Sequence, residues 1–161
     1  MSPADTRTVN DANGQDVAVA LKPSRVVSLS EPTTDKTLAL QVTPVGVVSG
    51  HGQSGVASYL ADRAGDIEIL GSVGTPNLEA IGAAHPDLIL VDGTSVKSDD
   101  AVTLSDLNQI APVFYADNSG DEWRETFTRT AAALGVEDEA TAKLAAFDAH
   151  VASVSSRLEE A

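Results

Sequence analysis

A glycine-rich segment is the part of the sequence whose spacing most directly suggests chemistry. Residues 50–55 read Gly-His-Gly-Gln-Ser-Gly and match the G-x-G-x-x-G pattern, in which a strand-to-helix turn brings backbone N–H groups to a pyrophosphate. This match predicts one alternative function, a nucleotide-binding enzyme domain that uses the Gly50–Gly55 loop. Three features oppose it: the motif follows the second predicted strand, Gly65 breaks the next helix, and Glu68 lies inside the following strand instead of closing it.

Residues that commonly carry out catalysis or bind metals are present, but their spacing does not suit either role. His51, His85 and His150 show neither the H-x-x-x-H nor the H-E-x-x-H spacing, so we expect no metal site in this chain. Ser54 does not form a G-x-S-x-G nucleophile motif, because Val56 stands where the second glycine is required. We therefore predict no catalytic residues and a protein that is not an enzyme.

Small polar residues and glycines gather in segments that follow the predicted strands. These segments are Ser30–Thr33, Ser49–Gly55, Gly74–Asn77, Asp92–Ser95 and Asp117–Ser119. Open parallel sheets bind ligands at the carboxyl ends of their strands, so these loops form the candidate binding edge. The same residues also suit ordinary turns, and composition alone leaves that alternative open.

The strands that must position these loops are predicted from hydrophobic patterning. Residues 6–22 alternate around Asn13-Gly14 and predict a β-hairpin. Short apolar runs predict strands at 26–29, 45–48, 67–70, 88–91 and 113–115. Because helical segments separate these runs, we expect right-handed βαβ units and an α/β fold, a Rossmann-like lobe with a mostly parallel sheet.

Capping residues indicate where the intervening helices begin. We expect Thr33 or Thr34 to cap a helix that runs to about Leu40, and Asn77 to cap one that Pro86 ends. A short helix is expected after the glycine loop, to about residue 64, and another over 102–110.

The last third of the sequence is predicted to be helical. One amphipathic helix over 123–134 is ended by Gly135. A second carries an apolar stripe to the end of the sequence: Ala140, Leu144, Phe147, Val151, Val154 and Leu158. We assign residues 1–136 to an α/β ligand-binding lobe and 137–161 to a long helix, roughly 30 Å in length, part of which packs on something this chain lacks.

Composition and charge restrict the classes of partner. The 161 residues carry a formal net charge of −14 and contain no cysteine. Such an acidic chain disfavours nucleic acid and anionic membrane surfaces as partners. No apolar run is long enough to span a bilayer. The first residues lack the basic and apolar regions of a signal peptide. An exported protein whose leader is absent from the sequence would look the same, so we expect this sequence to be compatible with export.

Several segments together resemble a known family. These are Arg25–Ser30, Val42–Val47, the block Val73–Ile81 with Asn77-Leu78-Glu79-Ala80-Ile81, His85–Leu90 with Pro86-Asp87-Leu88-Ile89, Ile110–Val113 and Ala133–Gly135. In this order, and over about residues 6–160, they resemble the iron-siderophore, haem and cobalamin solute-binding proteins of ABC importers. The family fold has two α/β lobes joined by one long helix, with ligand held between the lobes. The resemblance therefore implies an amino-terminal lobe and connecting helix, with the carboxyl-terminal lobe missing.

The resemblance also implies a function without bond-making chemistry. The expected role is capture of a ferric siderophore and its delivery to an ABC permease, outside the cytoplasm, either periplasmic or lipid-anchored. Haem or cobalamin is the alternative ligand within the family, and no cofactor is expected. Many ferric siderophores are anionic and are bound by arginines and aromatics. This lobe offers few such residues near its loops, so we expect a neutral or cationic ligand, or recognition by the missing lobe.

Positions of the family's functional residues can be transferred to this chain. By its place in the Asn77–Ile81 block, Glu79 aligns with the glutamate with which this lobe docks on the permease. The ligand would contact the predicted loops, with these candidates: Ser30, Glu31, His51, Thr75 and Asp92.

Overall fold

The computed structural model describes residues 5–50, 62, 65, 67–118 and 121–160. In chain order its elements are β1 (Thr6–Asn10), β2 (Asp16–Ala20), β3 (Val26–Ser28), α1 (Glu31–Ala39), β4 (Gly46–Ser49), β5 (Glu68–Ser72), β6 (Thr75–Pro76), α3 (Leu78–Ala83), β7 (Leu88–Asp92), α4 (Ala101–Ile110), β8 (Val113–Asp117), α5 (Trp123–Leu134) and α6 (Glu137–Glu160). The predicted short helix to about residue 64, most of the Gly50–Gly55 motif and His51 lie outside the described residues.

The main sheet confirms the predicted α/β fold. Its strand order is β6-β5-β4-β3-β7-β8, and all neighbours pair in parallel except β5 and β6. All five predicted strands are present, with ends shifted by a residue or two. The predicted hairpin is also present as a separate antiparallel pair, β1 and β2. The two-residue strand β6 was not predicted.

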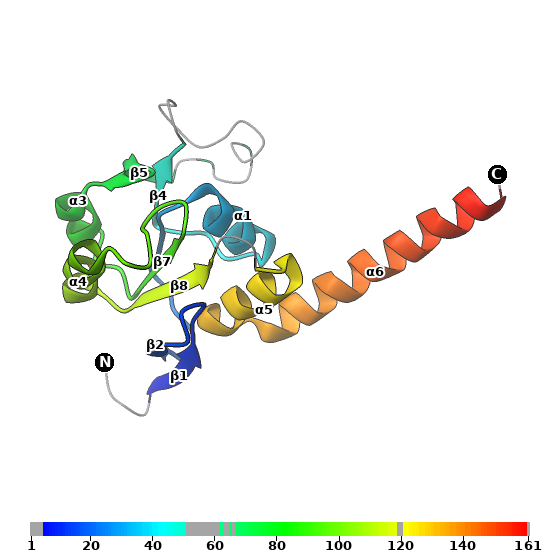
Figure 1. Cartoon of the computed structure of the whole chain (residues 1–161), viewed down its shortest axis with the longest axis horizontal. Helices are drawn as coiled ribbons and strands as arrows, with labels where there is room; N and C mark the ends of the chain where they lie inside the picture. The colour runs from blue at the N-terminus through cyan, green and yellow to red at the C-terminus, as the bar shows by residue number, and fades with distance from the viewer. Residues whose placement is uncertain (1–4, 51–61, 63–64, 66, 119–120, 161) are drawn as a thin grey trace.

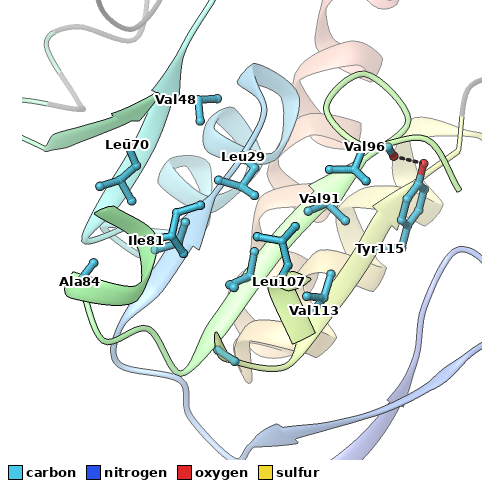
Figure 2. Packing of buried hydrophobic residues seen from close by; sticks show 13 residues of the cluster. Leu29, Val48, Leu70, Ile81, Ala84, Val91, Val96, Leu107, Val113 and Tyr115 are labelled. Carbon is cyan, nitrogen blue, oxygen red and sulfur yellow. Dashed lines mark hydrogen bonds between the residues drawn. The ribbon is translucent and has the colours of Figure 1, made fainter. Parts of the chain in front are cut away.

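Two hydrophobic clusters hold helices on opposite faces of the sheet (Figure 1). Because successive strand residues point to opposite faces, Leu90 belongs to one cluster and its neighbours Ile89 and Val91 to the other. Figure 2 shows the cluster that α3 and α4 cover, where the Tyr115 hydroxyl donates to the Val96 carbonyl at 2.7 Å. Helices α1 and α5 lie on the other side of the sheet (Figure 1).

Helix α1 begins earlier than the sequence suggested. Its cap is Ser30, whose side chain accepts from the Thr33 N–H at 3.1 Å, and Pro32 occupies the first turn, where a missing N–H costs nothing. The expectation that Thr33 or Thr34 caps this helix is therefore wrong. Both threonines lie inside the helix and are buried. The predicted cap at Asn77 is confirmed, since its side chain accepts from the Ala80 N–H at 3.1 Å.

The hairpin and α5 together hold the root of α6. Arg7 on β1 pairs with Glu137, the first residue of α6, and also donates to the Ala132 carbonyl. Gly135 takes a positive φ of 71° between the two helices, as predicted for a helix-ending glycine. Beyond residue 144 the described α6 side chains are exposed, and the helix projects away from the rest of the molecule (Figure 1).

Candidate functional site

The strand order places a topological switch point between β3 and β7. From β3 the chain moves outward to β4 and β5, and then crosses back to β7 and β8 on the other side of β3. Loops that leave the carboxyl ends of β3 and β7 therefore lead to helices that diverge, which is where open α/β sheets bind ligands. The loops after these two strands contain three of the predicted candidates, Ser30, Glu31 and Asp92.

A buried hydrogen bond connects the two loops at this point. Ser30 Oγ donates to Asp92 Oδ2 at 2.7 Å, and both side chains are almost fully buried. The other carboxylate oxygen of Asp92 accepts from the Thr94 N–H at 2.9 Å, the Thr94 hydroxyl at 2.6 Å and the Ser95 N–H at 3.2 Å. Asp92 thus shapes its own loop with one oxygen and holds the start of α1 with the other.

Threonine and serine hydroxyls continue this network beneath α1. Thr33 Oγ1 lies 2.8 Å from Ser30 Oγ and 2.5 Å from Ser28 Oγ, and Thr34 Oγ1 donates to the Ser30 carbonyl at 2.7 Å. All four residues are buried. Sequence analysis missed this cluster, although the close spacing of Ser28, Ser30, Thr33 and Thr34 around a strand-to-helix turn was a usable signal. The network fixes the direction in which α1 leaves the sheet.

A small cavity opens beside this network. It has a volume of about 230 Å³ and is lined by Glu31, Pro32, Gly50, Val73 and Thr94. These residues come from the loops after β3, β4, β5 and β7, so the cavity lies on the edge that the sequence predicted for binding. Its described lining combines a carboxylate, a hydroxyl, two small apolar side chains and exposed backbone, a set that can both contact and orient a ligand.

An ion pair lies at the same edge of the sheet, at the end of β8. Lys36 Nζ on α1 is 3.6 Å from Asp117 Oδ2. Burial raises the pKa of Asp117 above its usual value; the Lys36 ammonium opposes this rise and the Asp92 carboxylate adds to it. The pair joins α1 to β8 across the carboxyl edge.

Two of the remaining predicted site residues, Thr75 and Glu79, do not line the cavity. Thr75 is exposed on β6, and its hydroxyl is 2.6 Å from that of Ser72. Glu79 is exposed in the first turn of α3. His51 is outside the described residues. The structure therefore brings Ser30, Glu31 and Asp92 together, with Glu31 on the cavity wall and the other two buried behind it.

In the described part of the chain, no three His, Asp or Glu side chains cluster so that they could hold a metal ion. None of the described helices combines the length and apolarity needed to cross a bilayer.

Comparisons with known proteins agree on one family. A family model for periplasmic binding proteins matches residues 26–161. The chain is 32% identical over 158 residues to the probable siderophore-binding lipoprotein YfiY of Bacillus subtilis, covering 98% of this chain and 47% of the relative. It is 33% identical over 144 residues to the Fe(3+)-citrate-binding protein YfmC of the same organism, covering 88% and 44%.

A solved structure supports the same assignment. Staphylococcus aureus SirA in complex with staphyloferrin B matches with a TM-score of 0.77 and 32% identity, covering 91% of this chain and 48% of SirA. The chain thus spans about half the length of the curated relatives it matches. YfiY and YfmC are named as binding proteins, and the SirA structure contains staphyloferrin B. Because the family model matches 26–161 of its 161 residues, the chain belongs to the periplasmic binding protein family.

Proposed function

We propose that this protein captures a ferric siderophore outside the cytoplasm and presents it to an ABC permease, without changing it chemically. The observation that carries the proposal is the similarity, over nearly the whole chain, to relatives named for binding a siderophore or ferric citrate. Residues 1–136 would form one ligand-binding lobe and 137–161 the helix that leads to a second lobe. The start of α6 at Glu137 and its exposed outer half support this division.

The cavity at the switch point would be this lobe's share of the ligand site. At about 230 Å³ it is smaller than the roughly 300–1,000 Å³ of a complete small-molecule site, as one wall of a two-walled site should be. Glu31 and Thr94 would contact the chelate through their oxygens, and Val73 would cover an apolar part of it. Ser30 and Asp92, whose side chains are buried, would position these contacts. His51 and Thr75 stay predicted contacts.

Titration of the complete polypeptide that the gene encodes tests this function. We expect a saturable response to at least one ferric siderophore in a panel that contains anionic, neutral and cationic chelates. Thr94→Trp should fill the cavity and weaken binding about tenfold or more, because a ligand cannot enter occupied space. Thr141→Trp on the exposed side of α6 is the matched control and should bind normally.

Two results would count against the proposal. One is the absence of binding to every chelate, especially if haem, cobalamin, NAD or ATP binds instead. The other is an unchanged affinity in Thr94→Trp, which would remove the cavity from the site.

Docking to the permease is proposed to depend on Glu79. Its carboxylate is exposed in the first turn of α3, where the helix dipole favours a negative charge and a partner can reach it. Glu79→Ala should leave chelate affinity unchanged but weaken transport and permease docking. Glu68→Ala, which removes an exposed carboxylate from β5, is the control. Equal transport by Glu79→Ala and the parent protein would refute this role.

A further inference from the structure

A second and larger cavity lies away from the carboxyl edge, between the amino-terminal hairpin and β8. It has a volume of about 480 Å³. We call it the hairpin groove; its lining includes Asp16, Val17 and Ala18 of β2, Leu104 of α4, and Val113 and Tyr115 of β8. Its size is within the range of complete ligand sites, although nothing in the proposed siderophore function uses it.

One wall of the hairpin groove is an unpaired strand edge. The Leu21 N–H donates to the Asp5 carbonyl and the Asp11 N–H donates to the Gln15 carbonyl, each at 2.9 Å. These two hydrogen bonds show which opposed residues of β1 and β2 are hydrogen-bonded pairs, and every second pair between them is of the same kind. Because bonded and non-bonded pairs alternate, Val17 directs its backbone groups toward β1. The intervening residues Asp16 and Ala18 therefore direct theirs away from β1, into the groove.

The opposite wall is the outer edge of the main sheet. Strand β8 is last in the strand order, and Ile89 N–H donates to the Pro112 carbonyl at 2.9 Å. This bond sets the alternation so that Val113 and Tyr115 direct their backbone groups away from β7. Within the described residues, no strand pairs with this edge or with the outer edge of β2.

Hydrogen bonds join the two walls at one end of the groove. Ala12 N–H in the hairpin turn donates to the Tyr115 carbonyl at 2.8 Å, and Asn118 Nδ2 donates to the Ala12 carbonyl at 2.9 Å. The turn is thus anchored to β8, while β2 and β8 remain separated by the cavity. A preformed groove of this kind reduces the entropy lost when a partner binds.

The charge of the hairpin groove indicates what kind of segment fits it. Among the described residues that line it there are two carboxylates, Asp11 and Asp16, and no lysine or arginine. Asp11 is buried and accepts from two turn N–H groups, whereas Asp16 is exposed at the rim. Between the walls, the partly exposed side chains of Val17, Leu104 and Pro112 offer apolar surface.

From these features we infer that the hairpin groove binds an extended peptide segment of a partner protein, with alternating apolar and basic side chains, by strand addition. The segment's backbone bonds to the outward-facing groups of Asp16 and Ala18 on β2, because on β8 the Val113 N–H already donates to Asn108 Oδ1 and the Tyr115 carbonyl already accepts from Ala12. Its apolar side chains contact Leu104 and Pro112, and a basic side chain lies beside Asp16. Main-chain bonds supply the affinity in this mode and alternate side chains supply the specificity.

The test uses the complete polypeptide and the labelled peptide acetyl-Val-Lys-Val-Lys-Val-amide, with binding followed by fluorescence polarisation and amide NMR shifts. We expect saturable binding, with shift changes over 16–18 and 113–115. Ala18→Pro removes an N–H that faces the groove and should weaken binding about tenfold. Thr8→Pro is its matched control: Thr8 is paired with Ala18, so its N–H faces the other edge of the hairpin. It should bind normally.

A charge test accompanies the backbone test. Asp16→Lys should weaken binding about fivefold, and Glu68→Lys, the same change at an exposed residue of β5, should not. The analogue acetyl-Val-Glu-Val-Glu-Val-amide should bind at least about fivefold more weakly than the lysine peptide.

Each of four outcomes would overturn the inference. These are no peptide binding up to about a millimolar, equal binding of both peptides, equal losses in Ala18→Pro and Thr8→Pro, or a concentration-dependent dimer that Ala18→Pro abolishes. The last outcome would assign the groove to a second copy of this chain.

Discussion

Replacing Ser30 and Asp92 by alanine, singly and together, should reveal a strong energetic coupling between the two loops at the switch point. Ser30→Ala removes the α1 cap, which contributes about 1 kcal/mol, and a hydrogen bond to a carboxylate, which contributes about 1.5–3 kcal/mol. Asp92→Ala removes that bond together with the two bonds that the Thr94 N–H and hydroxyl donate to the same carboxylate, so we expect a loss of about 3–5 kcal/mol. The double variant should lose less than the sum of the two.

The assay is urea unfolding of the parent, both single variants and the double variant. For a buried pair at 2.7 Å we expect a coupling energy of about 1–3 kcal/mol with an unchanged denaturant slope. The exposed Ser72–Thr75 pair, with hydroxyls 2.6 Å apart, is the matched control and should couple by less than about 0.5 kcal/mol. A coupling of Ser30 with Asp92 as small as that of the control would refute the role assigned to this bond.

Two further predictions concern the stability of the lobe. Gly135→Ala should lower the free energy of unfolding by about 2 kcal/mol or more, because φ is positive and the new Cβ would overlap the Leu21 carbonyl oxygen. The control Gly14→Ala has a similar φ but open space around the new Cβ, and it should cost about 1 kcal/mol. Equal losses in the two variants would contradict this account. Burial raises the pKa of Asp117 in the folded state, so the folded protein holds this proton more tightly than the unfolded chain does. The stabilisation that comes from the bound proton is complete below the unfolded pKa and is lost as the pH rises through the folded pKa. The stability of Asp117→Asn relative to the parent should therefore increase between about pH 4 and pH 7 in pH-dependent unfolding; a decrease would show that the Lys36 ion pair outweighs burial.

The strands and the hairpin could be predicted because their signals are local. Leu88–Val91 is an uninterrupted apolar run, as a strand covered on both faces requires, and Asn13-Gly14 suits a tight turn. The α6 stripe likewise follows from spacing along a single helix. Strand β6 could not be predicted, since its pairing depends on the tertiary path of the turn through Gly71 and Gly74, both at positive φ.

The start of α1 shows how neighbouring signals compete. Ser30, Thr33 and Thr34 are all good caps in isolation, and choosing between them requires knowing where β3 ends. Pro32 was the residue that could have decided it, because proline is favoured in the first turn of a helix, which places the cap before it, at Ser30.

The site was predicted in part. Parallel topology was enough to gather the loops on one edge, and Glu31 lines the cavity there. That Ser30 would bond to Asp92 depends on β3 lying next to β7, which brings together residues 62 positions apart. Strand order is not encoded in local patterning, so the buried network could not be derived from the sequence.

The most direct test of the central claim is calorimetric titration of the complete polypeptide with a ferric siderophore and with the same siderophore free of iron. We predict one-to-one binding of the ferric form, at least about tenfold weaker binding in Thr94→Trp, and normal binding in Thr141→Trp. No heat from any ferric chelate, with saturable binding of a nucleotide instead, would contradict the account.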